Sequence, residues 1–351
     1  MGFGGGEVSG YNDGDMFKLN KRIGIDLGTV NSLVWLEGEG VVLNEKTVVA
    51  VSLNDGRVIA VGQEAQDMLG RTPMNIAASR PMRDGVIADY GITEAMLRTF
   101  ISRVMGRSFL IKPEVMVCVL SGATQVERRA VMDATLSAGA RSAYLIDEPL
   151  AAAIGANVPI AEASGNMILD IGGGAAEAAV ISLGGVVVSR SARVGGNALD
   201  EAIAKYVRKH HNLIIGDQTA EKIKFEVGAA VNPEKGKKMS VKGRDQATGM
   251  PREIELTALE VNEALSVPLG RVVKIVKEVL EEVPPELASD IIDKGIVMTG
   301  GTSTLKNFDV LLRESTGVPC SVAEEPMTAV IRGIGVALEN LELYKRSLKR
   351  R

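Results

Sequence analysis

The segments IGIDLGTVNS (residues 23–32) and ILDIGGG (residues 168–174) decide the fold. Both contain the pattern apolar-Asp-apolar-Gly, and the second copy follows the first by 144 residues, from position 26 to position 170. Each copy ends one apolar run and precedes another, which predicts a strand–turn–strand unit. One such unit opens each half of the chain. The sequence therefore indicates an internal repeat and two similar lobes that face each other.

The two turns have the composition of anion-binding loops. Glycine lets backbone N–H groups approach an anion closely because it carries no Cβ atom. Thr29, Asn31 and Ser32 can add side-chain donors to the same anion. An acid at the carboxyl end of each strand, Asp26 or Asp170, is well placed to hold Mg²⁺ beside phosphate oxygens. Two turns that clamp one polyphosphate from opposite sides would explain the duplication.

Other interpretations of the glycine motifs stay open. The two turns could be a pair of ordinary Gly-rich hairpins. The chain has no GxxxxGK[ST] motif, and Gly172–Gly174 precedes a strand pattern where a Rossmann fingerprint needs a helix. A third glycine pair, Gly300-Gly301, ends the apolar strand 296–299 and precedes a helix expected from residue 305. Such a pair suits close backbone approach to a flat ring, or it is a simple β–α turn.

The rest of the chain alternates strand and helix patterns, which is typical of an α/β protein. We expect helices at 93–104, 126–137 and 149–157. The expected strands are 22–25, 41–43, 48–53, 58–61, 115–120, 144–146, 166–170, 178–183 and 185–190. Cys118 lies in the apolar run 115–120, so we expect a buried thiol.

Composition excludes several classes of protein. The 351 residues suggest two domains or one two-lobed domain, and the net charge of -4 argues against non-specific nucleic-acid binding. No stretch approaches the roughly 18–20 apolar residues of a transmembrane helix, and the N-terminus lacks a secretory signal. Two cysteines 202 residues apart favour a reducing, cytoplasmic setting.

Two segments suggest contact with a membrane surface. Three large apolar residues lie between cations in a loop bracketed by Gly106 and Pro113; they are Phe109, Leu110 and Ile111. Such a loop suits insertion among anionic headgroups, and the alternative is that it folds back into the core. The last seven residues carry five positive charges. They form either a solvated tail or a contact with an acidic surface.

The sequence resembles the actin/Hsp70/sugar-kinase ATPase superfamily and, within it, the MreB/Mbl family of bacterial actins. The resemblance covers residues from about 18 to 342. It rests on IGIDLGTVNSLVW (23–35), RPMRDGVIADY (80–90), VERRAVMDATLSAGA (126–140), DEPLAAAIGA (147–156), DIGGGAAEAAVISLGG (170–185), TAEKIKFEVG (219–228) and PPELASDIIDKGIVMTGG (284–301).

The resemblance implies an actin-like ATPase fold and a set of site residues. It implies ATP and Mg²⁺ as ligands, with Asp26 and Asp170 near the metal and Glu148 placing the attacking water. It assigns Glu221 and Lys224 to ribose or base. The remaining cofactor contacts that it implies are Gly28, Thr29, Val30, Asn31, Gly172, Gly173, Gly174, Gly300 and Gly301.

The same resemblance implies four subdomains around a nucleotide cleft. The large subdomain of lobe I comprises 18–49, 83–162 and 332–351, and its small subdomain 50–82. The large subdomain of lobe II comprises 163–198 and 263–331, and its small subdomain 199–262. Residues 1–17 are expected to be a disordered extension.

The biological role that the resemblance implies is that of a cytoskeletal filament. We expect a homopolymer, as paired protofilaments, on the inner face of the cytoplasmic membrane. It would contact cell-elongation membrane proteins and help to determine rod shape by organising cell-wall synthesis. No nucleic-acid partner is expected.

One departure from the family pattern concerns hydrolysis. Relatives usually carry Thr-Thr after the second Asp-Ile-Gly-Gly-Gly, and here Ala175-Ala176 stand there. The loss of such donors can remove about 2–4 kcal/mol of transition-state stabilisation. Three hypotheses follow: a polymerising ATPase, a nucleotide-binding filament scaffold with little or no turnover, and a small-molecule kinase or chaperone of the same fold. Lys46, where Pro is usual, is a milder departure.

Overall fold

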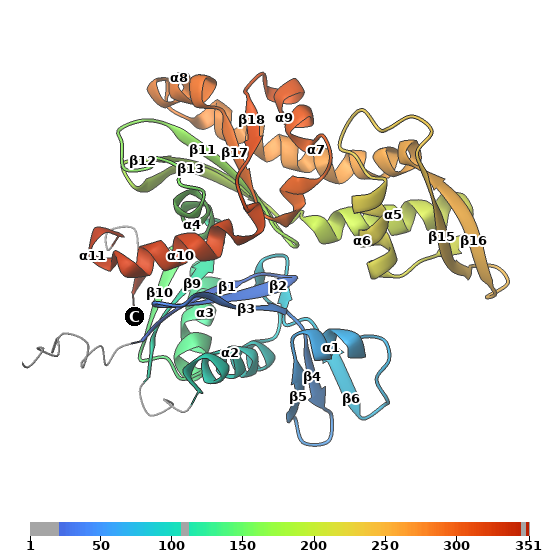
Figure 1. The fold of residues 1–351 in the computed structure, drawn as a ribbon, viewed down its shortest axis with the longest axis horizontal. Helices are drawn as coiled ribbons and strands as arrows, with labels where there is room; N and C mark the ends of the chain where they lie inside the picture. Colours follow the sequence, from blue (N-terminus) through green and yellow to red (C-terminus); the bar gives the residue numbers. More distant parts are fainter. Residues whose placement is uncertain (1–20, 107–111, 345–348, 351) are drawn as a thin grey trace, which may run out of the picture.

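The computed structural model describes residues 21–106, 112–344 and 349–350. The expected extension 1–17 and the three apolar loop residues Phe109, Leu110 and Ile111 lie outside the described residues. Figure 1 shows two lobes, one above the other, with helices packed between and around their sheets.

Lobe I is built on a six-stranded sheet in the order β19-β10-β9-β1-β2-β3. β1 pairs in parallel with β9 and antiparallel with β2. The strands are β1 (Arg22–Leu27), β2 (Asn31–Leu36), β3 (Gly40–Lys46), β9 (Glu114–Val119), β10 (Ser142–Asp147) and β19 (Lys349–Arg350).

Lobe II repeats this design with a five-stranded sheet in the order β13-β12-β11-β17-β18. β11 pairs in parallel with β17 and antiparallel with β12, as β1 does with β9 and β2. The strands are β11 (Asn166–Ile171), β12 (Ala176–Ser182), β13 (Gly185–Ala192), β17 (Ile296–Thr299) and β18 (Cys320–Val322). The internal repeat read from the two Asp-Gly motifs is therefore confirmed as a repeated strand–turn–strand unit.

Two helices, α4 (Glu148–Gly155) and α10 (Ala329–Glu339), lie between the sheets of the two lobes (Figure 1). Their Ala-rich and Ile-rich faces form one apolar core with inward residues of both sheets, among them Trp35, Met116 and Ile168. The lobes therefore share a core along one side, and the chain crosses between them there.

The other face of each large sheet is covered by longer helices. α2 (Tyr90–Met105) and α3 (Gln125–Ser137) cover lobe I, while α7 (Ala258–Glu282), α8 (Pro285–Lys294) and α9 (Phe308–Thr316) contribute to the core of lobe II. α3 and α7 each begin with a capping box, in which Thr124 and Thr257 exchange hydrogen bonds with the Glu three residues later.

Each lobe also carries a small three-stranded sheet. In lobe I, β5-β4-β6 packs with α1 around a core that includes Val48 and Ala65. In lobe II, β14-β15-β16 lies beside α6, and α5 contacts β14. The elements are β4 (Val49–Ser52), β5 (Val58–Val61), α1 (Gln63–Met68), β6 (Ile76–Ser79), α5 (Gly196–His211), β14 (Leu213–Ile214), α6 (Asp217–Glu226), β15 (Lys238–Asp245) and β16 (Pro251–Thr257).

The remaining elements are short. They are the hairpin β7 (Met82–Arg83) and β8 (Val86–Ile87), the 3₁₀ helices η2 (Gly301–Thr304) and η3 (Pro326–Thr328), and α11 (Leu341–Tyr344). The helix expected from residue 305 begins instead at Phe308, because Asn307 adopts a positive φ of 60° and η2 occupies the segment before it.

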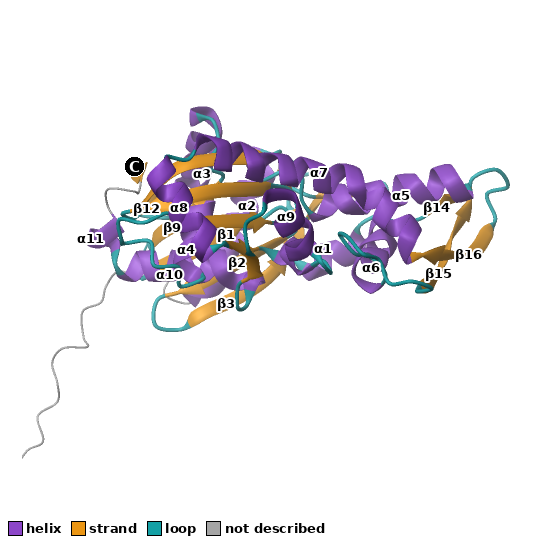
Figure 2. Ribbon diagram, turned by 90° about the horizontal axis from the view of Figure 1, so that it is seen from above, coloured by secondary structure: helices purple, strands orange, loops and turns teal. Residues whose placement is uncertain are grey.

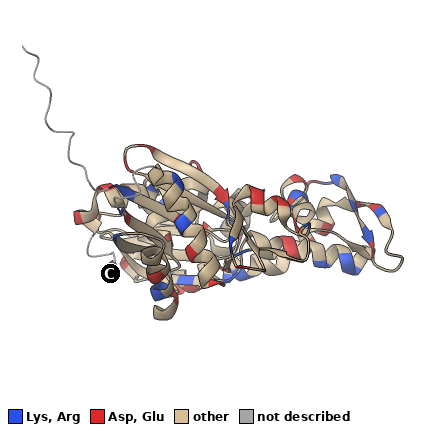
Figure 3. Cartoon of the chain, turned by 90° about the horizontal axis from the view of Figure 1, so that it is seen from below, with Lys and Arg blue, Asp and Glu red and all other residues tan. Residues whose placement is uncertain are grey.

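The molecule is elongated when seen from above, with α5 and α7 running lengthwise and the β15–β16 hairpin at one end (Figure 2). Charged residues of both signs are interspersed along the described chain (Figure 3). In the part of the chain that the structure describes, no helix has both the length and the apolar character needed to span a membrane.

Candidate functional site

A cavity of about 400 Å³ lies between the two lobes. Its walls come from the β1–β2 turn, the β11–β12 turn, the start of α5, α6 and the turn after β17. The predicted site residues that line it are Asp26, Gly28, Thr29, Val30, Asn31, Glu148, Asp170, Gly172, Gly173, Gly174, Glu221, Lys224, Gly300 and Gly301. Sequence reasoning thus selected residues that the fold brings together from both halves of the chain.

The two glycine turns contact each other, and both line the cavity. A Cβ atom on Gly173 would come within 2.2 Å of a Val30 methyl group, and one on Gly174 within 2.3 Å of the Thr29 hydroxyl oxygen. The lobes can therefore approach this closely only because both positions lack a side chain. The Thr29 hydroxyl also accepts a hydrogen bond of 2.9 Å from the Gly85 N–H at the tip of the β7–β8 hairpin.

The two acids at the ends of β1 and β11 are buried. Asp26 is 8% exposed and Asp170 is 3% exposed. Burial raises the pKa of Asp26 to about 7 and that of Asp170 to about 6, and the charge of Asp170 further raises the pKa of Asp26. Asp170 accepts a hydrogen bond of 2.7 Å from the Thr299 hydroxyl. The cavity therefore favours an added positive charge near both carboxyl groups.

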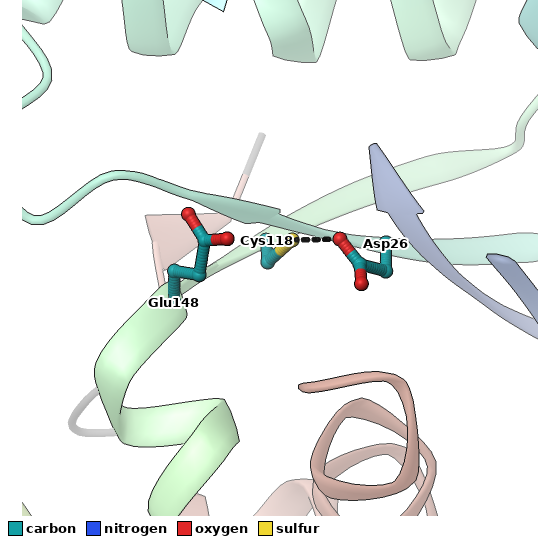
Figure 4. Close-up of side chains that lie close together, drawn as sticks. All are labelled: Asp26, Cys118 and Glu148. Carbon is teal, nitrogen blue, oxygen red and sulfur yellow. Dashed lines mark hydrogen bonds between the residues drawn. The ribbon is translucent and has the colours of Figure 1, made fainter. Parts of the chain in front are cut away.

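Glu148 is the first residue of α4 and faces the same cavity. Burial raises its pKa well above the usual range, and the charges of Asp170, Glu177 and Asp26 raise it further. Figure 4 shows the Glu148 carboxyl group and the Asp26 carboxyl group on either side of Cys118. The Cys118 thiol donates to Asp26 Oδ1 over 3.3 Å.

Cys118 is a residue whose place in the site the sequence did not reveal. The expected buried thiol is confirmed, with 7% exposure. Cys118 belongs to the apolar core between the lobes, and it also lines the cavity. The alternation of side chains along β9 turns Val117 and Val119 to the lobe I core and Cys118 to the opposite face.

Glu177 is a second acid that sequence reasoning missed. It is 1% exposed on β12 and accepts a hydrogen bond of 3.0 Å from the Ser121 N–H and another from the Ser191 hydroxyl. Ser121 belongs to lobe I and Glu177 to lobe II, so this carboxylate ties the lobes together behind the cavity. A single Glu within the apolar run AEAAVIS was the available signal, because an acid in a buried strand needs partners.

Arg128 holds the lobe I side of this contact. It is 7% exposed and donates to the carbonyl groups of Leu120, Ser121 and Ala123 at 2.9–3.3 Å. It also pairs with Asp147 Oδ1 at 2.7 Å, and Asp147 directly precedes Glu148. The loop that meets Glu177 and the start of α4 are therefore fixed by one guanidinium group.

The far end of the cavity is lined by α5 and α6. Lys224 is 3% exposed, and its ammonium group pairs with Asp200 at 2.9 Å. Burial raises the pKa of Asp200 to about 6, although the Lys224 charge opposes this shift. Glu221 is exposed one turn earlier. The Lys224–Asp200 pair joins two helices, and nothing local in the sequence predicts it.

Two sequence expectations at the site were wrong. Ser32 is fully buried, and its hydroxyl is hydrogen-bonded to that of Thr47 at 2.9 Å, so it does not line the cavity. Of the alanine pair, Ala175 lines the cavity, but Ala176 lies on β12 and packs into the lobe II core. The period of two along β2 and β12 explains both outcomes.

The chain matches the family model described as MreB/Mbl protein over residues 20–346. The chain belongs to the MreB/Mbl family. It is 52% identical over 331 residues to the cell shape-determining protein MreB of Escherichia coli (strain K12), covering 93% of this chain and 95% of the relative. It is 46% identical over 329 residues to the cell shape-determining protein Mbl of Bacillus subtilis (strain 168), covering 93% and 99%.

Solved structures place the fold among the actin-like proteins. The crystal structure of Spiroplasma citri MreB5 bound to ADP matches with a TM-score of 0.87 at 34% identity, covering 93% of this chain and 98% of that one. The double helical filament of MamK matches with a TM-score of 0.76 at 19% identity, covering 91% and 99%, which shows a shared fold. The expected actin-like α/β fold and the membership of a family of cell shape-determining proteins are both confirmed.

Proposed function

We propose that this MreB/Mbl family member binds ATP with Mg²⁺ in the cavity between its lobes and polymerises into filaments. The observation that carries the proposal is the contact between the two Asp-Gly turns, Val30 against Gly173 and Thr29 against Gly174, at the floor of the cavity. The Spiroplasma relatives solved with ADP and with AMPPNP support nucleotide as the ligand.

The residues present fit a magnesium ion. Asp26 and Asp170 supply oxygen donors from opposite lobes, which suit Mg²⁺. Neither forms an ion pair with a protein cation within the described residues. The ion would neutralise charge on the phosphate oxygens. The chain's own N–H groups in the two turns would bind and orient the phosphates, and Lys224 and Glu221 would contact the nucleoside.

Glu148 is our proposed residue for placing the attacking water. Its carboxyl group lies at the cavity wall and has no hydrogen-bond partner among the described residues, so it is free to accept from a water. The Arg128–Asp147 pair holds the start of α4 and so holds Glu148 in place. Orientation of the water is the main contribution that a protein makes to phosphoryl transfer.

A second candidate function is a nucleotide-binding filament scaffold with little or no hydrolysis. Ala175 favours it, because this cavity-lining position offers no hydroxyl group to a phosphate or a water. Phosphate release measured below and above the polymerising concentration separates the two. Turnover that rises with assembly supports the ATPase, and assembly without turnover supports the scaffold.

We further propose the biological context and subdomain boundaries that the family suggests. The filaments would consist of paired protofilaments at the inner face of the cytoplasmic membrane. There they would meet cell-elongation membrane proteins and help to organise cell-wall synthesis. The small sheets β5-β4-β6 and β14-β15-β16 lie within the proposed small subdomains, residues 50–82 and 199–262, apart from Val49 at the start of β4.

The experiment that tests nucleotide binding is a melting curve with and without Mg-ATP. A ligand that binds only the folded state stabilises it by about 2.7 kcal/mol at 100 times its Kd. Asp170→Ala should remove most of that shift. Asp293→Ala is a matched control, because Asp293 is an exposed acid on α8 outside the cavity. The absence of a shift in the parent at millimolar Mg-ATP would refute the proposal.

A further inference from the structure

Asp26, Cys118 and Glu148 form a group of three metal-ligating side chains at the cavity wall (Figure 4). The ligand atoms of the group, one from each residue, all lie within 4.8 Å of one another. They come from three separate elements, the carboxyl-terminal ends of β1 and β9 and the start of α4. The group is therefore set by the fold and not by the flexibility of one loop.

The spacing suits one metal ion. Zinc lies about 2.0–2.3 Å from its sulfur and oxygen ligands, so two ligands of one tetrahedral ion are about 3.3–3.8 Å apart. The three ligand atoms lie within 4.8 Å of one another, so side-chain rotations that move them up to about 1 Å closer would complete the site. Asp170 does not belong to this group, so the three ligands all come from lobe I.

The electrostatic surroundings also favour a cation. Asp26 is 8% exposed and Cys118 is 7% exposed. Among the described residues, the Asp26 carboxyl group has one side-chain hydrogen bond, which it accepts from Cys118. The Glu148 carboxyl group has none among them. The charges of Asp170 and Glu177 add to those of the two carboxylates. A divalent cation would therefore replace repulsion between buried acids with attraction.

The donor set selects the kind of metal. Two carboxylates alone would suit Mg²⁺, whereas a thiolate favours softer ions such as Zn²⁺. Three protein ligands with an open fourth position facing a cavity is the arrangement of zinc sites that accept an exogenous ligand. Binding would exchange the Cys118 S–H bond for a sulfur–metal bond, and the proton would pass to the solvent.

We propose that Asp26, Cys118 and Glu148 form a binding site for a thiophilic divalent cation, Zn²⁺ in particular, in the nucleotide-free chain. The site shares Asp26 with the magnesium position proposed above. The zinc site does not depend on nucleotide binding, and zinc there would compete with Mg-nucleotide.

The test is a titration of the full chain, freed of metal and nucleotide, with Co²⁺ as a spectroscopic probe for Zn²⁺. A cobalt–thiolate bond produces a near-ultraviolet charge-transfer band that cobalt–carboxylate bonds do not. We expect this band to saturate at one Co²⁺ per chain and to disappear when Zn²⁺ is added. Absence of the band in the parent, or Co²⁺ binding without it, would overturn the proposal.

The chain offers a matched control for the thiol. Cys320 is the second free cysteine, and its sulfur donates to the Val318 carbonyl oxygen at 3.4 Å. Cys118→Ser should abolish the band and Cys320→Ser should retain it. The opposite result would place the metal elsewhere. Glu148→Gln should weaken Co²⁺ binding at least tenfold and leave the intensity of the band per bound ion unchanged. An unchanged affinity for Co²⁺ would exclude Glu148 as a ligand and so contradict the three-ligand site.

A second measurement separates this inference from the proposed function. The Mg-ATP melting shift is measured on the parent and on Cys320→Ser, and a cooperative melting transition of Cys118→Ser reports that this variant folds. A parent that binds Co²⁺ through sulfur but shows no Mg-ATP shift would retain the zinc site and reject nucleotide binding. The reverse pattern would reject the zinc site alone.

Discussion

Asp26 and Asp170 are buried acids, and the charge of Asp170 raises the pKa of Asp26. Their pKa values of about 7 and about 6 lie above the ordinary value of 3.8. The folded chain therefore binds more protons than the unfolded chain between about pH 4 and pH 7. Stability from this source is fully present below pH 4 and is lost as the pH rises through the folded-state pKa values.

The first prediction concerns the pH dependence of stability. Without metal or nucleotide, the free energy of unfolding should fall from pH 5.5 to pH 8. Asp26→Asn should flatten this fall by on the order of 1–3 kcal/mol, since one pKa unit corresponds to about 1.4 kcal/mol and the site is coupled. Urea unfolding in EDTA at constant ionic strength measures it. A parent that becomes more stable over this range would contradict the pKa directions.

The second prediction separates the two alanines. Ala175 lines the cavity, so Ala175→Thr adds a hydroxyl group where a phosphate or water can use it. If a missing donor limits turnover, phosphate release should rise by about 100- to 1000-fold, the range known for single donors. Ala176 is fully buried in the lobe II core, so Ala176→Thr should instead lower stability by about 1–3 kcal/mol.

The readouts for the alanine pair are steady-state phosphate release and urea unfolding of both single variants. A parent that already turns over as fast as Ala175→Thr would show that the alanine is irrelevant to hydrolysis. Faster turnover from Ala176→Thr alone would mean that the β12 strand shifts when nucleotide binds.

At the scale of elements, the crossing of α4 and α10 decides how close the lobes lie. Gly155 and Gly333 meet there. A Cβ atom on Gly155 would lie 1.8 Å from the Ala329 carbonyl oxygen, and one on Gly333 would lie 1.8 Å from that of Ala151. Real Cβ contacts do not reach such distances, so each helix backbone fills the space that a side chain would need on the other.

The third prediction follows from this crossing. Gly155→Ala and Gly333→Ala should each destabilise the chain by about 3 kcal/mol or more, because the two helices must separate. Gly270→Ala is the matched control within a helix. Gly270 is exposed on α7 with nothing within 4 Å of its added Cβ, so the change should stabilise by roughly 0.5–1 kcal/mol. Thermal unfolding of the three variants tests this, and equal effects would refute the close crossing.

At the scale of the whole molecule, the sequence predicted what is local and missed what folding brings together. The turns at Asp26 and Asp170 and the strands that flank them are readable because glycine and apolar patterns act over a few residues. Resemblance to the family added Glu148. The Cys118–Asp26 and Lys224–Asp200 contacts were missed, because each joins elements whose approach depends on the packed lobes.

The inward or outward direction of side chains was the other source of error. Ser32 was interpreted as a neighbour of the ligand because it follows a glycine turn, and Ala176 because relatives usually carry Thr at that position. Both lie on strands, where successive side chains point to opposite faces. If the side chains of Asn31 and Ala175 face the ligand, this alternation places the next residues, Ser32 and Ala176, in the interior.

We expect membrane attachment to be a property of the assembled molecule and to depend on residues 109–111, which lie outside the described residues. The elements on either side are described: α2 ends at Met105, and β9 begins at Glu114. Arg103 in the last turn of α2 pairs with Glu45 at 3.1 Å. The Arg103 charge is thus partly neutralised within the protein. We therefore expect Arg103 to contribute less to membrane binding than the roughly 1 kcal/mol that an unpaired cation gains near anionic lipid.

The last prediction is that attachment depends on Phe109, Leu110 and Ile111 and becomes strong only in filaments. Full burial of such side chains contributes about 1.5–3 kcal/mol each and less at an interface, so one subunit binds weakly. A filament repeats the loop at every subunit, and linked weak sites bind with far higher overall affinity. Assembled protein should therefore sediment with anionic liposomes. Leu110→Ser with Ile111→Ser should release it without preventing assembly. Equal liposome binding by this variant would transfer the role to the basic residues 345–351, and loss of folding would instead show that the loop packs into the core.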